Sequence, residues 1–186
     1  MRLMVWVSAI WVAIAFSAWA GPEKISFPEG YQSHFVRYVT MDKPKLKAVR
    51  FLCVNPESLQ TAEPNRPAPY GTVIVMQDNK AKLGPDGVPV KDALGRFVPT
   101  TEITNIFVQK KQPGWGTEYT AEKRNGEWEY AWFGPAGKPR PGDAAHGFDP
   151  KVNFDRCFAC HKEQAEARDY MYTLHDFIAS IKTKTP

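Results

Sequence analysis

The chain has 186 residues, with 24 Lys or Arg and 20 Asp or Glu, which gives a formal net charge of +4 at pH 7. This balance is too mild to indicate a nucleic-acid partner, and no basic run alternates with aromatic residues, so we expect no nucleic acid. The length fits a single domain with its own hydrophobic core.

The N-terminus has the parts of a secretory signal peptide. Arg2 precedes an apolar run from Leu3 to Phe16, and Ala18-Trp19-Ala20 places small residues where a signal peptidase reads. The alternative is a retained membrane anchor, for which the apolar run is short. We therefore predict a signal peptide at residues 1–20, one mature domain at residues 21–186 and a location in the bacterial periplasm.

The first part of the mature domain predicts two strands. Residues 32–38 have a mixed pattern that favours no element. The apolar run at residues 47–54 predicts a strand that stops at a turn or short helix start at residues 55–58. Three prolines indicate a loop over residues 60–70, and the β-branched run at residues 71–78 predicts the clearest strand.

Turns and further strands follow. Gly, Pro and Asp residues at positions 84–100 are typical of turns and predict a long insertion or a hairpin. Residues 103–111 predict another strand, which ends at the Gly-rich turn of residues 112–116.

Residues 127–133 predict a half-buried strand after an Asn-Gly turn. Trp128, Tyr130 and Trp132 alternate with smaller or polar residues, so the three aromatic rings share one face. A core-facing strand and a wall beside a cofactor both require such an aromatic face, and the two interpretations are compatible.

Helical signals appear only near the C-terminus. Residues 134–149 are rich in Gly and Pro and predict a loop. Asp155 is expected to cap a helix over residues 156–168, and Thr173 a helix over residues 174–182. Strands followed by a short helical tail predict an α+β fold, predominantly an antiparallel β-sheet with a short helical C-terminal segment that contains residues 157–161.

The sequence Cys157-Phe158-Ala159-Cys160-His161 has the spacing of a haem c attachment site. Each thiol forms a thioether to a haem vinyl group, and the adjacent histidine ligates the iron. The motif predicts one covalent haem c per chain, bound by Cys157 and Cys160, with His161 as the metal ligand. A thioredoxin-like redox pair would normally follow a strand in a βαβ pattern. Half of a zinc site would require a second ligand pair, and the remaining cysteine, Cys53, is isolated.

Cys53 has no intramolecular partner if the other two cysteines bind haem. We expect it to be a buried small hydrophobic residue, and the alternative is an intersubunit disulfide. Neither interpretation assigns it a role in cofactor binding.

The ordered set of motifs resembles the cytochrome P-460 family of mono-haem c-type cytochromes, which includes the cytochromes c-prime-beta. The motifs are Val49 to Ser58, Tyr70 to Met76, Pro113 to Gly116, Asn125 to Tyr130, Cys157 to Lys162 and Asp169 to Thr173. The resemblance implies a β-rich homodimer with one five-coordinate haem c whose distal side is open to small nitrogen species.

The resemblance also implies the function. Some members oxidise hydroxylamine, whereas the c-prime-beta members bind nitric oxide in an apolar distal pocket. We therefore expect a haem protein that binds a small nitrogen-oxide ligand, nitric oxide, and exchanges electrons with a periplasmic redox partner. The alternatives are a hydroxylamine or nitric oxide oxidoreductase and a plain electron-transfer cytochrome.

Two departures from the family pattern argue against the enzyme. The enzymatic members share a lysine, joined covalently to the haem ring, at the position of Met76, and a thioether cannot supply an amine. They also share a glutamate shortly before the first haem cysteine. Residues 151–156 contain no Glu, and the nearest carboxylates are Asp149 and Asp155.

Several residues are candidates for the distal side of the iron, opposite His161. The candidate sixth ligands are His34, His146, His175, Met76 and Met171. We expect Met76 to pack beside the haem rather than to ligate it, because thioethers commonly fill apolar gaps. Arg50 either points at the distal pocket or a haem propionate, or is a surface arginine on an edge strand.

Overall fold

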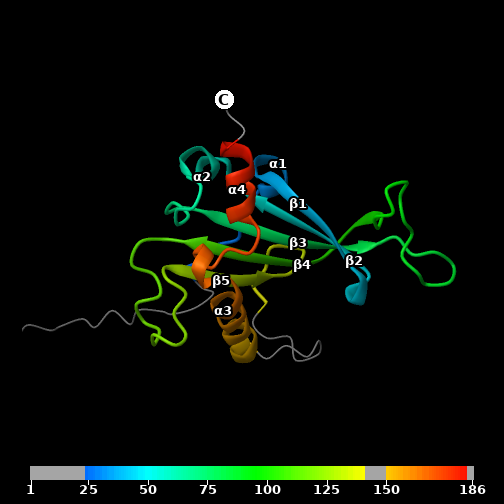
Figure 1. The fold of residues 1–186 in the computed structure, drawn as a ribbon. Coiled ribbons are helices and arrows are strands. Elements are labelled where there is room, and N and C mark those ends of the chain that lie inside the picture. Colours follow the sequence, from blue (N-terminus) through cyan, green and yellow to red (C-terminus); the bar gives the residue numbers. More distant parts are fainter. Residues whose placement is uncertain (1–23, 141–149, 184–186) are drawn as a thin grey trace, which may run out of the picture.

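The computed structural model describes residues 24–140 and 150–183, with side chains described from residue 156 in the second stretch. Five antiparallel strands form one sheet in the order β1-β2-β3-β4-β5 (Figure 1). The strands are β1 (Val36–Lys43), β2 (Ala48–Val54), β3 (Val73–Ala81), β4 (Pro99–Lys111) and β5 (Trp128–Phe133). The helices are α1 (Tyr31–His34), η2 (Pro44–Leu46), α2 (Pro56–Thr61), α3 (Pro150–Ala165), η4 (Glu166–Arg168) and α4 (Leu174–Lys182). The predicted α+β fold is confirmed.

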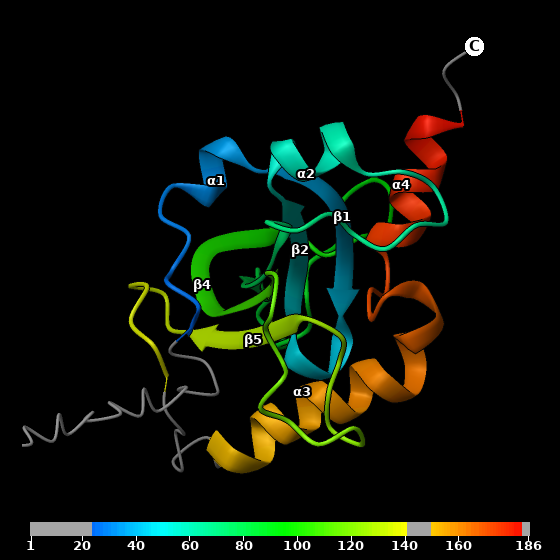
Figure 2. The same cartoon turned by 90° about the vertical axis from the view of Figure 1, so that its left-hand side faces the viewer.

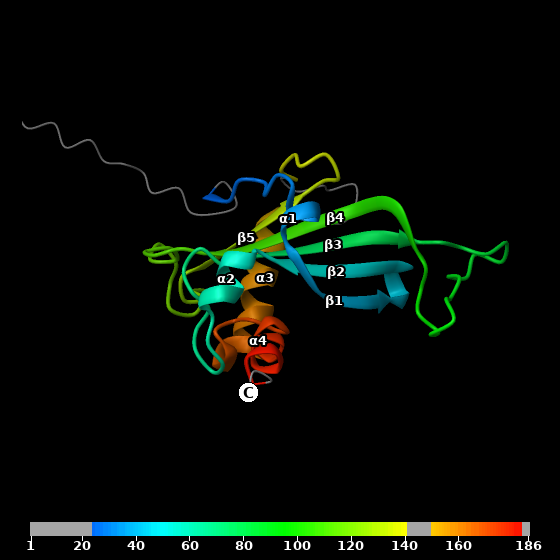
Figure 3. The same cartoon turned by 90° about the horizontal axis from the view of Figure 1, so that it is seen from above.

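Helices and the N-terminal segment cover opposite faces of the sheet (Figures 2 and 3). One face, here called the helical face, packs against α3 and α4; its core residues are Val54, Ile74, Trp128, Tyr130, Phe158, Met171, Leu174 and Ile178. The other face, here called the N-terminal face, packs against the segment before β1; its core residues are Ile25, Tyr31, Cys53, Val75, Ile106, Val108, Ala131 and Phe133. Cys53 is buried, as predicted, and lies on the N-terminal face.

The strands confirm most of the sequence predictions and correct two. The structure contains β2, β3 and β4 where strands were predicted. The strand β1 was not predicted, because it is a partly polar edge strand whose alternation is broken by a bulge near Tyr38. The expectation that β5 is half-buried is wrong: the N-terminal segment covers its second face, and even Glu129 has 0% exposed surface.

The C-terminal helices begin and end partly as predicted. The prediction that α3 starts after Asp155 is wrong: the helix begins at Pro150, a residue favoured in a first helical turn because it has no N–H to satisfy. The helix α4 has the predicted bounds and Thr173 is its N-cap residue, but the Thr173 hydroxyl donates to the Tyr38 phenol oxygen and makes no capping hydrogen bond. The predicted signal peptide, most of the loop before α3 and the Asp155 side chain lie outside the described residues. No helix within residues 24–140 and 150–183 is long and apolar enough to cross a bilayer.

Candidate haem site

Helix α3 is fixed to β5 at the haem motif. Phe158 is buried, and its ring lies edge-on to Tyr130 with centroids 4.9 Å apart. The centroid of the Tyr119 ring lies 4.7 Å from that of the Phe158 ring. The Asn125 amide donates to the Phe158 carbonyl at 3.0 Å and to the Tyr130 hydroxyl at 2.9 Å. The motif is therefore held in place by the ring contacts of Phe158 and by the hydrogen bond to its carbonyl.

The two cysteines of the motif differ in environment. They are three residues apart on α3, so they lie on neighbouring turns of one helix side. Cys157 packs against the core, and burial raises the pKa of its thiol to about 11. Cys160 is exposed, with its sulfur 3.0 Å from the phenol oxygen of Tyr172, which also donates to the Cys160 carbonyl at 2.9 Å. Both thiols are free, and Tyr172 is a contact that the sequence analysis missed.

His161 has the tautomer that a metal ligand requires. Its Nδ1 lies 2.7 Å from the Tyr170 carbonyl oxygen and must donate, because a carbonyl only accepts. The proton on Nδ1 leaves the lone pair on Nε2. Burial lowers the pKa of the imidazole, so the ring is neutral at pH 7. The rings of Tyr130 and Tyr172 each lie 4.8 Å from it and fix its plane.

The carbonyl that orients this histidine is itself held by a distant ion pair. Asp169 and Tyr170 have left-handed backbone angles, with φ of 52° and 59°, which are costly for residues with side chains. The Asp169 carboxylate accepts from Lys111 Nζ at 2.7 Å and from the Ala68 N–H at 2.8 Å. Gln109 Nε2 donates to the Tyr170 carbonyl at 3.2 Å. These contacts from the sheet stabilise the turn and aim its carbonyl.

We expect Asp169→Ala to lower the free energy of unfolding by about 2–4 kcal/mol, because it leaves the nearly buried Lys111 ammonium without its carboxylate. Urea unfolding of the holoprotein measures the loss. The control is Asp176→Ala, which removes a carboxylate that is 70% exposed and 3.5 Å from Arg168, and should cost under about 1 kcal/mol. Equal losses in the two variants would contradict the role given to Asp169.

An apolar row lies on the helical face next to the ring that contacts the histidine. Leu52 pairs with Met76, Met76 with Phe107, and Phe107 with Trp132 across four strands. Trp132 is two residues from Tyr130 and shares its face. The rings of Phe107 and Trp132 are stacked, 5.7 Å apart and 7° from parallel. Met76 and Phe107 keep part of their surface accessible.

Arg50 lies on the same face of the sheet, in the cross-strand row beside the apolar one, together with Asp78 and Asn105. Its guanidinium is fully engaged in an ion pair. Its Nε and Nη2 donate to the two carboxylate oxygens of Asp78 at 2.6 and 2.7 Å. Asp78 is 1% exposed and pairs across the sheet with Asn105, whose amide oxygen accepts from Trp132 Nε1 at 3.1 Å. The strand β2 lies between β1 and β3, so the interpretation of Arg50 as an edge-strand arginine is wrong.

The other candidate sixth ligands lie in different places. His34 is exposed in α1, with Nδ1 2.8 Å from a backbone carbonyl oxygen. Met171 is 1% exposed within the core, and His175 lies in α4 with Nδ1 3.3 Å from a neighbouring carboxylate. His146 lies outside the described residues. Met76 is the candidate in the apolar row.

The residues of α3 fit a c-type haem. Two free thiols and a neutral imidazole lie on adjacent helical turns, and an apolar row lies on the sheet face that this helix covers. Cys53 lies on the N-terminal face of the sheet, so it does not complete a zinc site with Cys157 and Cys160. The strand before α3 is antiparallel to its neighbour, which differs from the βαβ setting of a thioredoxin-like pair.

Comparison with known proteins gives one family. The chain matches the family model described as Cytochrome P460 over residues 28–173, which is more than three quarters of its length. The matched region begins after the predicted signal peptide and includes all five strands and the haem motif. Comparison with curated proteins gave no match.

Proposed function

The chain belongs to the cytochrome P460 family, and we propose that it is a periplasmic cytochrome that binds nitric oxide at an open distal iron site. Family membership implies a c-type haem. We propose that Cys157 and Cys160 hold one haem covalently and that His161 ligates its iron. Haem iron with a vacant sixth position supplies a binding site for a diatomic ligand. The homodimer and the periplasmic redox partner implied by the resemblance belong to the same proposal.

The observation that carries the proposal is the tautomer of His161. Its Nδ1–H is used by the Tyr170 carbonyl, so Nε2 is the nitrogen left for iron. Burial keeps this imidazole neutral, so no proton must leave before it ligates. The chain thus offers one prepared axial ligand, whereas the described histidines His34 and His175 lie on other elements.

The apolar row favours ligand binding over hydroxylamine oxidation. The row supplies only hydrocarbon groups and a thioether, from Leu52, Met76 and Phe107. These groups exclude water and form no strong hydrogen bond to a small uncharged ligand. Met76 stands where the enzymatic members have their cross-linking lysine, so the chain lacks the amine for that bond.

We expect the ferrous holoprotein to show an ordinary five-coordinate spectrum that shifts when nitric oxide is added, and Met76→Leu to leave the starting spectrum unchanged. The reason is that Met76 packs beside the haem and does not ligate it. Absorption spectroscopy measures both, and sedimentation of the same sample gives the mass of the homodimer.

Other spectra would contradict the proposal in distinguishable ways. A six-coordinate spectrum that becomes five-coordinate in Met76→Leu would identify Met76 as a ligand and favour electron transfer. A strongly red-shifted Soret band would indicate a modified haem and favour the oxidoreductase. A spectrum that nitric oxide does not change would reject ligand binding.

A further inference from the structure

The segment between β3 and β4 forms an ordered arm that extends beyond the sheet (Figures 1 and 3). Residues 82–98 make two successive tight turns, with bridges between Leu83 and Pro89 and between Lys91 and Phe97. The Val90 N–H donates to the Lys82 carbonyl, and the Val98 N–H donates back to the Val90 carbonyl. The arm therefore holds its shape through its own backbone hydrogen bonds.

The acidic side chains of the arm serve its turns. Asp86 Oδ1 accepts from the Val88 N–H at 3.0 Å, and Asp92 Oδ1 accepts from the Leu94 and Arg96 N–H groups at 2.9 Å. Each turn ends on a glycine with a φ above 70°, a backbone conformation that disfavours other residues. Both carboxylates thus accept hydrogen bonds from backbone N–H groups of the arm.

Positive charge is concentrated at this end of the molecule. The connector at residues 43–47 contacts the arm, because Lys47 Nζ donates to the Gly87 carbonyl at 2.9 Å. The connector and the arm together carry six basic and two acidic side chains. Their net charge of +4 equals the formal net charge of the whole chain. The Asp42 carboxylate also accepts from the Phe97 N–H of the arm, and with Asp42 included this end still carries a net charge of +3.

Large apolar side chains are exposed among these cations. Leu94 at the tip of the second turn is 82% exposed, Leu46 in the connector 59%, Val88 56% and Leu83 46%. They make up four of the seven exposed large hydrophobic residues in the part of the chain that the structure describes. A cationic surface that also exposes apolar side chains has the composition of a surface that lies at a membrane interface.

We propose that the arm and the connector dock the protein on an anionic lipid bilayer. The apolar side chains lie singly at turns, whereas a stable protein interface requires a continuous patch of about 800 Å² on each partner. A bilayer interface admits apolar side chains one at a time and places phosphate groups around them. Lysine and arginine near such a surface are attracted over about one Debye length. The arm extends away from α3, so docking leaves the haem site accessible (Figure 1).

Vesicle binding of the holoprotein tests the proposal and does not depend on what the iron binds. We expect the protein to sediment with vesicles that contain about one third phosphatidylglycerol, weakly with phosphatidylcholine alone, and less at high salt. Arg96→Glu should lower the partition coefficient about tenfold or more, and Leu94→Asp should lower it about as much.

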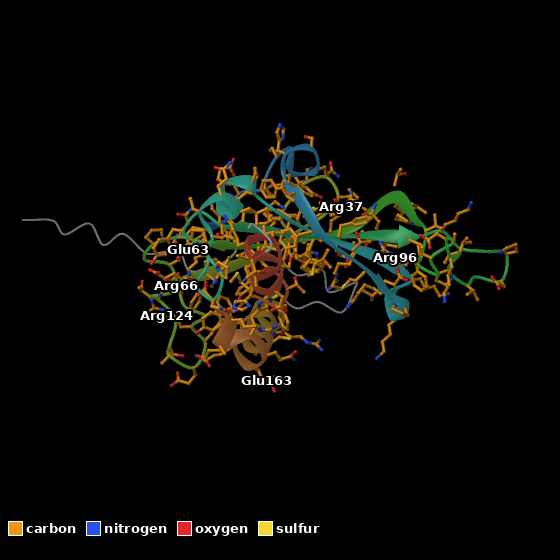
Figure 4. All side chains as sticks on the ribbon, turned by 45° about the horizontal axis from the view of Figure 1, so that its top comes forward. Arg37, Glu63, Arg66, Arg96, Arg124 and Glu163 are labelled. Carbon is orange, nitrogen blue, oxygen red and sulfur yellow. The ribbon has the colours of Figure 1, made fainter. Side chains whose placement is uncertain are left out.

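The matched control is Arg66→Glu, which makes the same change in net charge at the opposite end of the molecule (Figure 4). It should change the partition coefficient by less than about twofold, because Arg66 lies at the other end of the molecule and screening weakens attraction with distance. Equal effects of Arg66→Glu and Arg96→Glu would overturn the proposal, as would no binding to anionic vesicles. A fall in sedimentation mass caused by Leu94→Asp would assign the arm to a second copy of the chain and would also overturn it.

Discussion

Replacing both Cys157 and Cys160 by serine is expected to remove all covalent haem. Each thioether joins a cysteine sulfur to a haem vinyl carbon, and a hydroxyl does not take the place of the sulfur. The intact mass of the mature variant should equal that of the polypeptide, whereas the parent protein should be heavier by one haem. Either single variant should keep one bond and hold the group less firmly.

Cys53→Ser is the matched control for this loss. Cys53 is 7% exposed and lies on the N-terminal face, away from the motif, so the variant should keep one haem. Mass spectrometry of digested parent protein gives an independent check that requires no variant to fold. The haem should be found on the peptide that contains the motif. Haem on a peptide from β3, or retained in the double variant, would contradict the assignment.

The parts of the site that depend on neighbouring residues could be predicted from the sequence, and the parts that depend on distant ones could not. The spacing of the haem motif and the β-branched residues before Met76 are local patterns; the first predicted the haem attachment residues and the second predicted the strand β3, whereas the family resemblance implied that Met76 lies near the haem. The partner of Arg50 is Asp78, 28 residues away, and only the register of β2 against β3 brings them together. Sequence reasoning therefore found the arginine and missed its ion pair.

The orientation of His161, the proposed iron ligand, is the clearest case of a long-range effect. His161 and Tyr170 are nine residues apart, but their hydrogen bond depends on a left-handed turn at two residues that are not glycine. Asp169 is of a residue type that adopts this conformation more often than most, but Tyr170 is not, so the sequence does not predict the turn. Lys111, 58 residues before Asp169, stabilises the turn from β4. The orientation of the His161 imidazole thus depends on residues of the sheet.

Breaking the Arg50–Asp78 ion pair is expected to destabilise the protein more than any other surface or strand substitution considered above. Asp78→Ala leaves the guanidinium, whose side chain is only 16% exposed, without a counter-charge inside the fold. Removal of one partner of a buried pair typically costs about 3–5 kcal/mol. Urea unfolding of the holoprotein measures the loss, provided that the unfolding slope is unchanged.

An exposed pair between β3 and β4 gives the control and shows that burial causes the effect. Lys80 and Glu102 are 2.6 Å apart but 56% and 60% exposed, so Glu102→Ala should cost under about 1 kcal/mol. The double variant Arg50→Met/Asp78→Leu should recover most of the stability lost in Asp78→Ala, because it removes both charges and keeps the volume filled. A double variant as unstable as Asp78→Ala would show that the fold requires the charged pair itself and not merely the absence of an unpaired charge. The packing of the apolar row that contains Met76 would then depend on the neighbouring ion pair between Arg50 and Asp78.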